Sequence, residues 1–276
     1  MSKKFNALSR KKFKSNFKKK KGSIPKAPIL MILGVLLFFV AAGVALYNSQ
    51  KNKIEIDKNS FCPLEKEYIN HQYTILIDAT DKLPKLYSQK IKELIKDIEL
   101  DMKKYDKLSI YILNDSEDNY LIEKFSMCNP GRGRDINPLI GSQKIAEYQW
   151  RKNFHKPLDK LLNDLESLSE AKRTPLLDGL EQLMTKFKLS KVKNQTLYIV
   201  SDLMEYTKSF SMYMHGVSTA GFDSKYFDTY DIDFDNLELH VILVKRDKLK
   251  KFQTRKFKSF WKNFFKQKGT AFVVYQ

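Results

Sequence analysis

The sequence is poor in the residues that build zinc sites and networks of disulfides. It contains two cysteines and four histidines among 276 residues. No cysteine–histidine spacing resembles a zinc-binding motif, because the histidines are scattered along the whole chain. We therefore expect no zinc site. The histidines are His71, His155, His215 and His240.

Two cysteines are the smallest number that can form an intramolecular disulfide. Cys62 precedes the first predicted strand, and Cys128 lies in the sequence SMCNPG. A disulfide between them would fasten the segment before the domain to the domain itself. The alternative is two unpaired thiols.

Acidic residues are absent from the first 27 positions, which hold eleven lysines and arginines. Positive charges beside an apolar segment favour the cytoplasmic side of a membrane, so we predict a basic cytoplasmic tail over residues 1–27. The tail is either a topology signal alone or also a binding site for anionic lipid headgroups. Its basic residues are Lys3, Lys4, Arg10, Lys11, Lys12, Lys14, Lys18, Lys19, Lys20, Lys21 and Lys26.

Charge is also absent from Ile29 to Tyr47, which read ILMILGVLLFFVAAGVALY. A helix of about 19 apolar residues nearly crosses the ~30 Å hydrocarbon core of a bilayer, so we predict a transmembrane helix over residues 28–48. The alternative is a signal peptide cleaved near small residues such as Ala41 and Ala45. The composition, rich in lysine and poor in glycine, suggests a bacterium. The predicted location is the inner membrane, crossed once, with the C-terminal domain periplasmic or extracellular.

The formal net charge of +18 falls to +7 over residues 28–276 once the tail is set aside. Lysine and glutamate are interspersed along the predicted helices, as on ordinary solvated faces, and no nucleic-acid-binding motif is present. We therefore expect no nucleic-acid partner.

After a polar linker or stalk over residues 49–70, apolar runs alternate with amphipathic stretches through one domain at 71–276. This alternation predicts an α/β fold, with a doubly wound, mostly parallel sheet covered on both faces. Residues 119–125 alternate in polarity and are assigned to an antiparallel edge strand. Residues 248–267 form either a helix that covers the sheet or one that lies on a membrane. The other predicted strands are 73–77, 108–113, 196–201, 237–244 and 271–275, and the other helices are 84–105, 142–168 and 175–188.

Two carboxylates follow predicted strands at the carboxyl edge of the sheet, where ligands of open parallel sheets bind. Asp78 follows QYTILI and Asp202 follows TLYIVS, while Thr80 and Thr174 supply hydroxyl groups. If the two strands are neighbours, these oxygens form a site for a hard divalent cation. The alternative is that the polar residues only cap helices.

These residues resemble the metal-ion-dependent adhesion site of the von Willebrand factor A (VWA) family. Asp78-Ala79-Thr80-Asp81-Lys82 stands in place of the family's D-x-S-x-S motif, Thr174 in place of its mid-chain threonine, and Asp202 in place of its later aspartate. The resemblance covers roughly residues 71–276 and implies a Rossmann-like fold, a protein partner and bound Mg²⁺ or Mn²⁺. Lys82 departs from the motif, because it stands where the family has the second Ser. Its ammonium group could itself pair with the carboxylates and replace the metal.

Two further segments carry candidate binding residues. In CNPGRGRDIN (128–137), Arg132 and Arg134 either hold a phosphate or carboxylate or belong to a turn leading into the next helix. The stretch Met204–Asp235, rich in Tyr, Phe and Met, is either a surface for a partner or part of the packing on the sheet.

The function that these patterns favour is a protein-binding or scaffold module in a membrane-associated assembly, and not an enzyme. The alternative is a divalent-metal-dependent phosphoesterase or nuclease that uses Asp78 and Asp202. No complete catalytic set is apparent in the sequence, and we expect no small-molecule substrate.

Overall fold

The computed structural model describes residues 26–51, 54–139, 141–165, 171–215, 217, 224–270 and 273–275. The chain divides into two units, residues 1–53 and residues 54–276. Almost all of the basic tail predicted over residues 1–27 lies outside the described residues.

The described part of the first unit is the helix α1 (Lys26–Lys51). A bilayer span requires about 20 successive, predominantly apolar residues. Among the described residues, none of the helices combines the length and the apolar character that crossing a bilayer requires. The prediction of a transmembrane helix over residues 28–48 is therefore wrong. The prediction of a single-pass inner-membrane location, with the domain periplasmic or extracellular, is wrong for the same reason.

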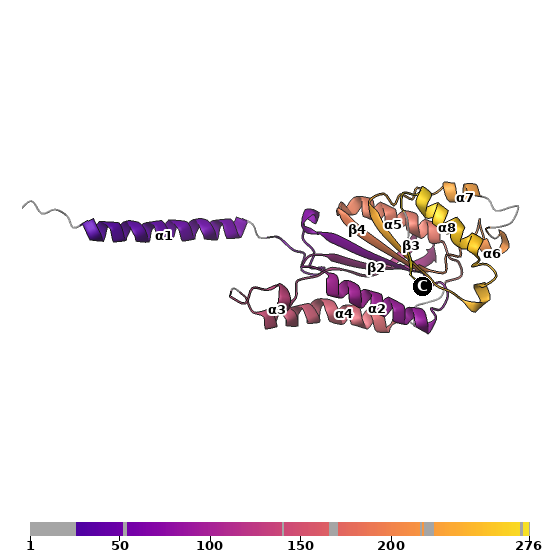
Figure 1. Ribbon diagram of the computed structural model, residues 1–276, viewed down its shortest axis with the longest axis horizontal. Coiled ribbons are helices and arrows are strands. Elements are labelled where there is room, and N and C mark those ends of the chain that lie inside the picture. Colours follow the sequence, from indigo (N-terminus) through magenta and orange to yellow (C-terminus); the bar gives the residue numbers. More distant parts are fainter. Residues whose placement is uncertain are drawn as a thin grey trace, which may run out of the picture. The chain divides into compact units, whose positions relative to one another are not determined.

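The second unit contains a six-stranded sheet with strand order β3-β2-β1-β4-β5-β6. Figure 1 shows strands β2, β3 and β4 of this sheet among its helices. β3 pairs antiparallel with β2, and every other neighbouring pair is parallel. The predicted mostly parallel sheet with an antiparallel edge strand is confirmed. The strands are β1 (His71–Ile77), β2 (Lys107–Ser116), β3 (Asn119–Cys128), β4 (Asn194–Ser201), β5 (Leu237–Leu243) and β6 (Val273–Tyr275).

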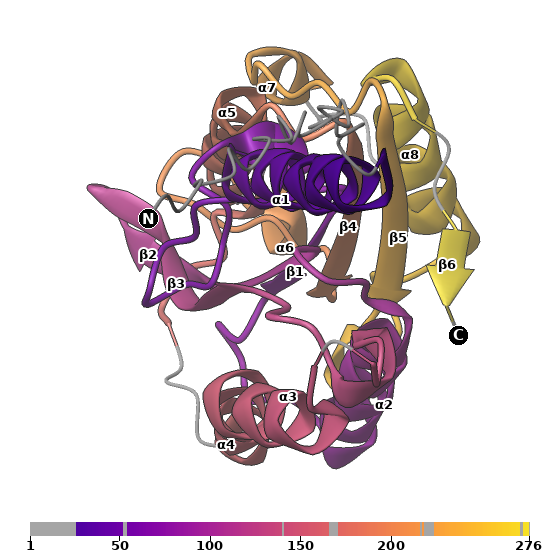
Figure 2. The same cartoon turned by 90° about the vertical axis from the view of Figure 1, so that its left-hand side faces the viewer.

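Helices cover both faces of the sheet, as Figure 2 shows. Successive residues of a strand point to opposite faces, and in β1 Ile75 and Ile77 join one apolar cluster while Leu76 joins the other. Strands buried on both sides explain the continuous apolar runs in the sequence. One face carries α2 (Lys85–Asp101), α3 (Gln143–Trp150), a π-helical turn (Arg151–His155) and α4 (Lys156–Asn163). The other carries α5 (Leu176–Ser190), α6 (Met212–His215), α7 (Ser224–Asp228) and α8 (Arg255–Gln267). Short 3-10 turns occur at Lys66–Tyr68, Gly133–Asp135 and Asp247–Leu249.

Helix α8 packs its aromatic face into the core. Phe257, Trp261 and Phe265 are almost completely buried against the cluster that α5 also contacts. The prediction that this segment covers the sheet before the last strand is thus confirmed. The helix begins at Arg255, later than predicted, because Asp247–Leu249 forms a 3-10 turn and the Thr254 side chain caps α8 by accepting a hydrogen bond from the Phe257 N–H at 3.3 Å.

A disulfide joins Cys62 to Cys128, with the two Cα atoms 4.8 Å apart. Cys128 ends β3 and is fully buried, and its N–H donates to the Ser60 carbonyl at 2.8 Å. The bond therefore fastens the segment before β1 to the antiparallel edge of the sheet, as the sequence predicted.

Removing this disulfide should destabilise the fold. The bond closes a loop between residues 66 positions apart, for which the loop-closure model gives about 4 kcal/mol. We expect the Cys62→Ser/Cys128→Ser variant to lose roughly that much free energy of unfolding in urea titrations. Reducing the parent protein should reproduce the loss. An unchanged midpoint and slope in both cases would show that the bond contributes no stability.

Candidate functional site

The residues predicted to form a site do meet at the carboxyl edge of the sheet. β1 and β4 are parallel neighbours, with Ile77 paired to Val200, and Asp78 and Asp202 follow them directly. Both aspartates are buried, with 3% and 5% of their surface exposed. We call Asp78, Thr80, Thr174, Asp202 and the later Arg246 the carboxyl-edge site.

Both carboxylate oxygens of Asp78 accept hydrogen bonds from hydroxyl groups. Oδ1 accepts from Thr80, from its hydroxyl at 2.6 Å and its N–H at 3.2 Å, and Oδ2 accepts from the Ser201 hydroxyl at 2.6 Å. The Thr80 and Thr174 hydroxyl oxygens are 2.8 Å apart. Since the single proton of Thr80 goes to Asp78, Thr174 is the donor in that pair. The structure thus places Thr174 at the site, as expected, through its contact with Thr80. It also places Ser201 at Asp78, which was not predicted from the sequence.

The cation at Asp202 is Arg246. Its Nε donates to Asp202 Oδ2 at 3.0 Å, and its terminal nitrogens donate to the backbone carbonyls of Asp81 and Lys82. Asp202 Oδ1 accepts from the Met204 N–H at 3.1 Å. The side chain of Lys82 is exposed, and it makes no ion pair with any residue that the structure describes. The sequence reasoning considered an internal cation but placed it on the wrong residue.

A signal for Arg246 was present in the sequence. It follows β5, which pairs parallel with β4, so it reaches the same edge as the two aspartates. A residue three positions beyond the end of a third parallel strand is therefore a natural member of the site.

Electrostatics explain why a cation is needed here. Burial, followed by the neighbouring Asp78, raises the pKa of the Asp202 carboxyl well above its usual range, and Arg246 opposes that shift. Every carboxylate oxygen of the two aspartates already accepts a hydrogen bond from this chain. Among the described residues, no group of three or more His, Cys, Asp or Glu could hold a metal ion. The carboxylate oxygens are thus occupied by partners from this chain while Arg246 is in place, and binding of Mg²⁺ or Mn²⁺ stays a prediction.

Beside the site, three exposed side chains form what we call the edge patch, namely Tyr206, Tyr213 and Met214. They are 40%, 37% and 82% exposed. The rings of Tyr206 and Tyr213 lie edge to face at 6.0 Å, and Tyr213 also packs against Phe252 at 5.5 Å. Burial, and then the charge of Asp202, raises the pKa of Tyr213.

The stretch Met204–Asp235 combines packing on the sheet with exposed aromatic and apolar side chains, and its use as a surface for a partner stays a prediction. Phe210, Met212 and Phe227 are buried in the core, whereas the edge patch is exposed. Residues 216 and 218–223 of this stretch lie outside the described residues.

The glycine-rich segment after β3 forms a turn. Gly131 has a φ of 97°, a conformation that favours glycine. The Asn129 side chain donates to the carbonyls of Met102 and Lys103, in the loop between α2 and β2. Arg134 donates to the Leu100 carbonyl at 2.6 Å. The guanidinium of Arg132 lies 4.0 Å from the ring centre of Trp150. The turn thus leads towards α3, and both arginines contact their own chain.

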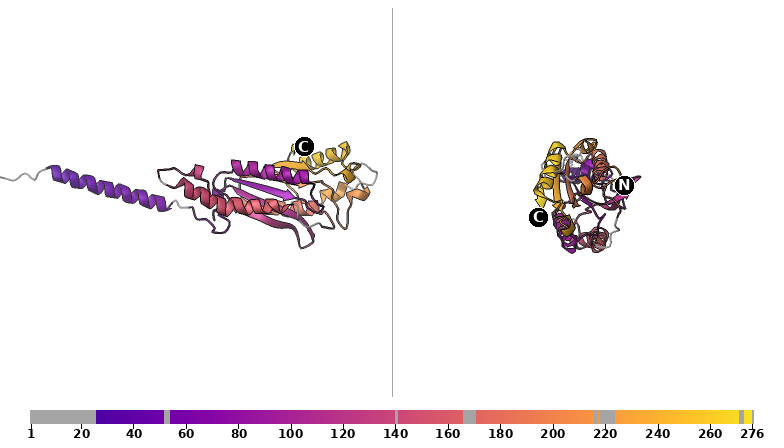
Figure 3. Two further views of the ribbon diagram at one scale, coloured as in Figure 1. Left: turned by 90° about the horizontal axis from the view of Figure 1, so that it is seen from below. Right: turned by 90° about the vertical axis from the view of Figure 1, so that its right-hand side faces the viewer.

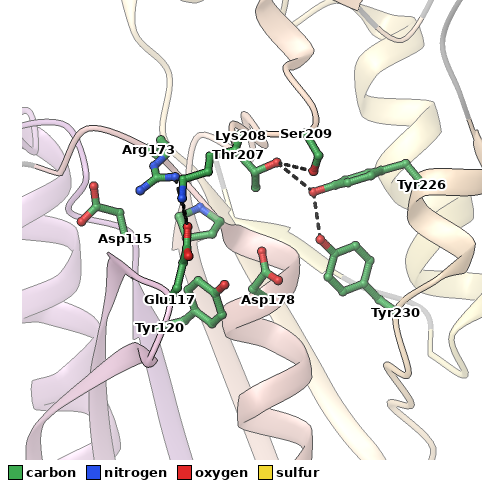
Figure 4. A pocket seen from close by; sticks show the side chains of 11 residues that line it. Asp115, Glu117, Tyr120, Arg173, Asp178, Thr207, Lys208, Ser209, Tyr226 and Tyr230 are labelled. Carbon is green, nitrogen blue, oxygen red and sulfur yellow. Dashed lines mark hydrogen bonds and ion pairs between the residues drawn. The ribbon is translucent and has the colours of Figure 1, made fainter.

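A small pocket of about 180 Å³ lies between the β2–β3 hairpin and the loop after β4 (Figure 4). Glu117 at the hairpin pairs with Arg173 at 3.6 Å and with Lys208. On the opposite wall, Tyr230 donates to the Tyr226 hydroxyl at 2.8 Å. The sequence reasoning missed this pocket, because its residues come from segments far apart in the chain.

Behind this pocket lies a fully buried carboxyl group, that of Glu205. Its Oε2 accepts from the Leu177 N–H in the first turn of α5 at 3.1 Å, and its Oε1 accepts from the Tyr226 hydroxyl at 3.1 Å. Burial raises the pKa of Glu205 to about 8. The group thus holds the loop after β4 against the start of α5.

The second unit is a mixed α/β protein with a mostly parallel sheet between two layers of helices, as the resemblance to the VWA family implies. No family model matches the chain, and no curated protein matches it. Among solved structures, it is similar to the crystal structure of the ArnB paralog VWA2 from Sulfolobus acidocaldarius. The identity is 14% and the TM-score 0.35, over 63% of this chain and 34% of that chain. The chain thus spans about a third of the length of that protein, and a likeness of this extent defines no function.

Removing Arg246 should expose the paired carboxylates to metal ions. We expect Arg246→Ala to lose roughly 3–5 kcal/mol of stability, because it leaves two buried carboxylates without their cation. Mg²⁺ or Mn²⁺ should then raise its melting temperature, while the parent protein shows no such response. The milder Arg246→Gln provides the same comparison if the alanine variant does not fold.

Lys82→Ser is the matched control, and it should show no metal response, because Lys82 makes no described ion pair. A parent protein that these ions stabilise, and that loses the response on Asp78→Ala, would instead reveal a working metal site.

Glu205 should make stability depend on pH. Its pKa is higher in the folded protein than the ordinary value of 4.5, so the folded state binds more protons than the unfolded state between pH 4.5 and about 8. Its contribution therefore favours folding at low pH and is lost as the pH rises towards 8. We expect Glu205→Gln to flatten the decline in unfolding free energy between pH 5 and 8. The variant should exceed the parent at pH 9 by on the order of 3 kcal/mol.

Glu93→Gln, on the exposed face of α2, is the control and should keep the parent's slope. Equal slopes for Glu205→Gln and the parent would show that Glu205 is ionised in the folded state.

Proposed function

We propose that the second unit is a protein-binding module that contacts its partner through the edge patch and needs no bound metal to do so. The observation that supports this most directly is the position of three exposed apolar and aromatic side chains beside a site whose charge Arg246 already balances. Tyrosine and methionine are enriched in protein interfaces and give a large contact area.

The backbone that carries the edge patch is held in place before any partner binds. Thr174 and Tyr206 exchange two backbone hydrogen bonds, at 2.8 and 3.0 Å. The Met212 N–H donates to the Glu205 carbonyl at 3.0 Å. A surface that is ordered in advance loses less conformational entropy on binding, which favours its use for recognition.

The alternative of a metal-dependent phosphoesterase or nuclease receives no support from the geometry. Such chemistry needs carboxylates that are free to bind metal ions and substrate. Here Asp78 is saturated by Thr80 and Ser201, and Asp202 is paired with Arg246.

Photocrosslinking from the edge patch tests the proposal. A photoreactive phenylalanine analogue at Met214 should form a discrete adduct with a partner in extracts of the source organism. The same analogue at Leu189 is the control, because Leu189 is 67% exposed but lies near the opposite end of the sheet. Tyr213→Ala should reduce the adduct at position 214 several-fold, and a chelator should leave it unchanged.

Equal adducts from positions 214 and 189 would contradict the choice of surface. Loss of the adduct in chelator would contradict metal-independent binding.

A further inference from the structure

A groove lies on the other face of the sheet, between α2 and the segment formed by α3, the π-helical turn and α4. These helices run side by side there (Figure 2 and Figure 3). The groove has a volume of about 550 Å³, within the range of small-molecule sites. α2 contributes residues spaced three and four apart, including Lys92, Ile95, Lys96 and Glu99, so one stripe of that helix faces the groove.

The floor of the groove is apolar and well ordered. Ile95, Trp150, Leu158 and Leu162 line it and are all at least nine-tenths buried. The accessible apolar surface of the groove comes mainly from Leu100, which is 47% exposed, while these buried side chains support it from below.

The rim of the groove is cationic. Lys92, Lys96, Arg132 and Arg151 line it, against the carboxylates of Glu99 and Asp159. Glu99 is buried, and both of its oxygens lie close to His155 Nδ1, at 2.8 and 3.1 Å. Arg132 is likewise engaged, because it pairs with Glu147 at 3.4 Å. Lys92, Lys96 and Arg151 then face Asp159 alone, and this balance favours an anion.

Three planar groups are stacked along one wall. The Arg132 guanidinium lies over the Trp150 ring, and the Trp150 and His155 rings lie 5.2 Å apart with 17° between their planes. His155 reaches this position through the π-helical turn Arg151–His155, which adds a residue to the helical turn. Such turns interrupt regular helices and occur often at functional sites.

Two N–H donors in this stack have no acceptor. Trp150 Nε1 and Arg132 Nε are buried and without a hydrogen-bond partner among the described residues, although Trp150 is 96% buried. A buried donor without an acceptor costs free energy that a ligand oxygen would recover. Trp261 Nε1 is also without a partner in the core, so an orphaned donor alone does not mark a site. Trp150 and Arg132 differ from Trp261 in that both residues line the groove, beside further cationic side chains.

We propose that this groove binds a small organic anion, a carboxylate or phosphate carried on an apolar body. The apolar part lies against Leu100 and Leu162, above the buried Ile95 and Leu158, and the charged group pairs with Arg151 and Lys96 at the rim. The site lies on the opposite face of the sheet from α5 and α8, and it is independent of the proposed protein-binding function.

Calorimetric titration of the full chain with 2-naphthoate tests the proposal. We expect a single site with a dissociation constant below about 1 mM. The uncharged isostere 2-naphthamide and the bare headgroup acetate should each bind at least tenfold more weakly, because each lacks one half of the recognised chemistry. Failure of 2-naphthoate to bind, or equal binding of the amide, would overturn the proposal.

Variants locate the binding. Arg151→Ala combined with Lys96→Ala should weaken 2-naphthoate binding about tenfold. Lys152→Ala is the matched control, because Lys152 is the exposed neighbour of Arg151 but does not line the groove. Melting temperatures of the variants should equal that of the parent. Equal losses in the double variant and in Lys152→Ala would show nonspecific attraction and overturn the assignment. Binding of an acidic peptide in the groove, together with no binding of 2-naphthoate, would overturn it as well.

Discussion

Two like charges buried side by side at the ends of adjacent strands impose the main constraint on this fold. Asp78 and Asp202 are both almost inaccessible, and burying two neighbouring carboxyl groups is costly unless other groups compensate them. The chain compensates them with hydroxyl groups from Thr80 and Ser201 and with the guanidinium of Arg246. These donors come from the loop after β1, from the end of β4 and from the segment after β5. Compensation of the two carboxylates therefore fixes how these segments converge.

The same constraint reaches outward into the surrounding loops. Arg246 also donates to two carbonyls of the loop after β1, so one side chain joins the loops that follow β1, β4 and β5. A few positions beyond Asp202, Glu205 binds the first turn of α5, and Tyr206 pairs with Thr174. The exposed edge patch thus rests on a scaffold that polar contacts fix before any partner arrives, which is the condition for low-cost recognition.

The sequence was a good guide where one physical signal dominated. Continuous apolar runs identified the buried parallel strands, and alternating polarity identified β3 as the antiparallel edge. The adjacency of Asp78 and Asp202 followed from the rule that parallel strands end at one edge. The signal failed for Arg246, because the family motif drew attention to Lys82, a neighbour in sequence, while a neighbour in space supplied the cation. The pocket of Figure 4 was not predictable, since hairpin, loop and helix residues meet there only through tertiary packing.

The carboxyl-edge site and the groove beside α2 differ in how completely their polar atoms are satisfied. At the carboxyl edge, each carboxylate oxygen accepts a hydrogen bond and the partly buried Arg246 supplies positive charge, so an added ion would have to displace existing partners. In the groove, cationic side chains surround open volume, and the N–H groups of Trp150 and Arg132 lack acceptors among the described residues. A buried donor gains most from a new acceptor when it has none to lose. The groove therefore leaves more polar groups of this chain unsatisfied than the edge that the family resemblance singles out.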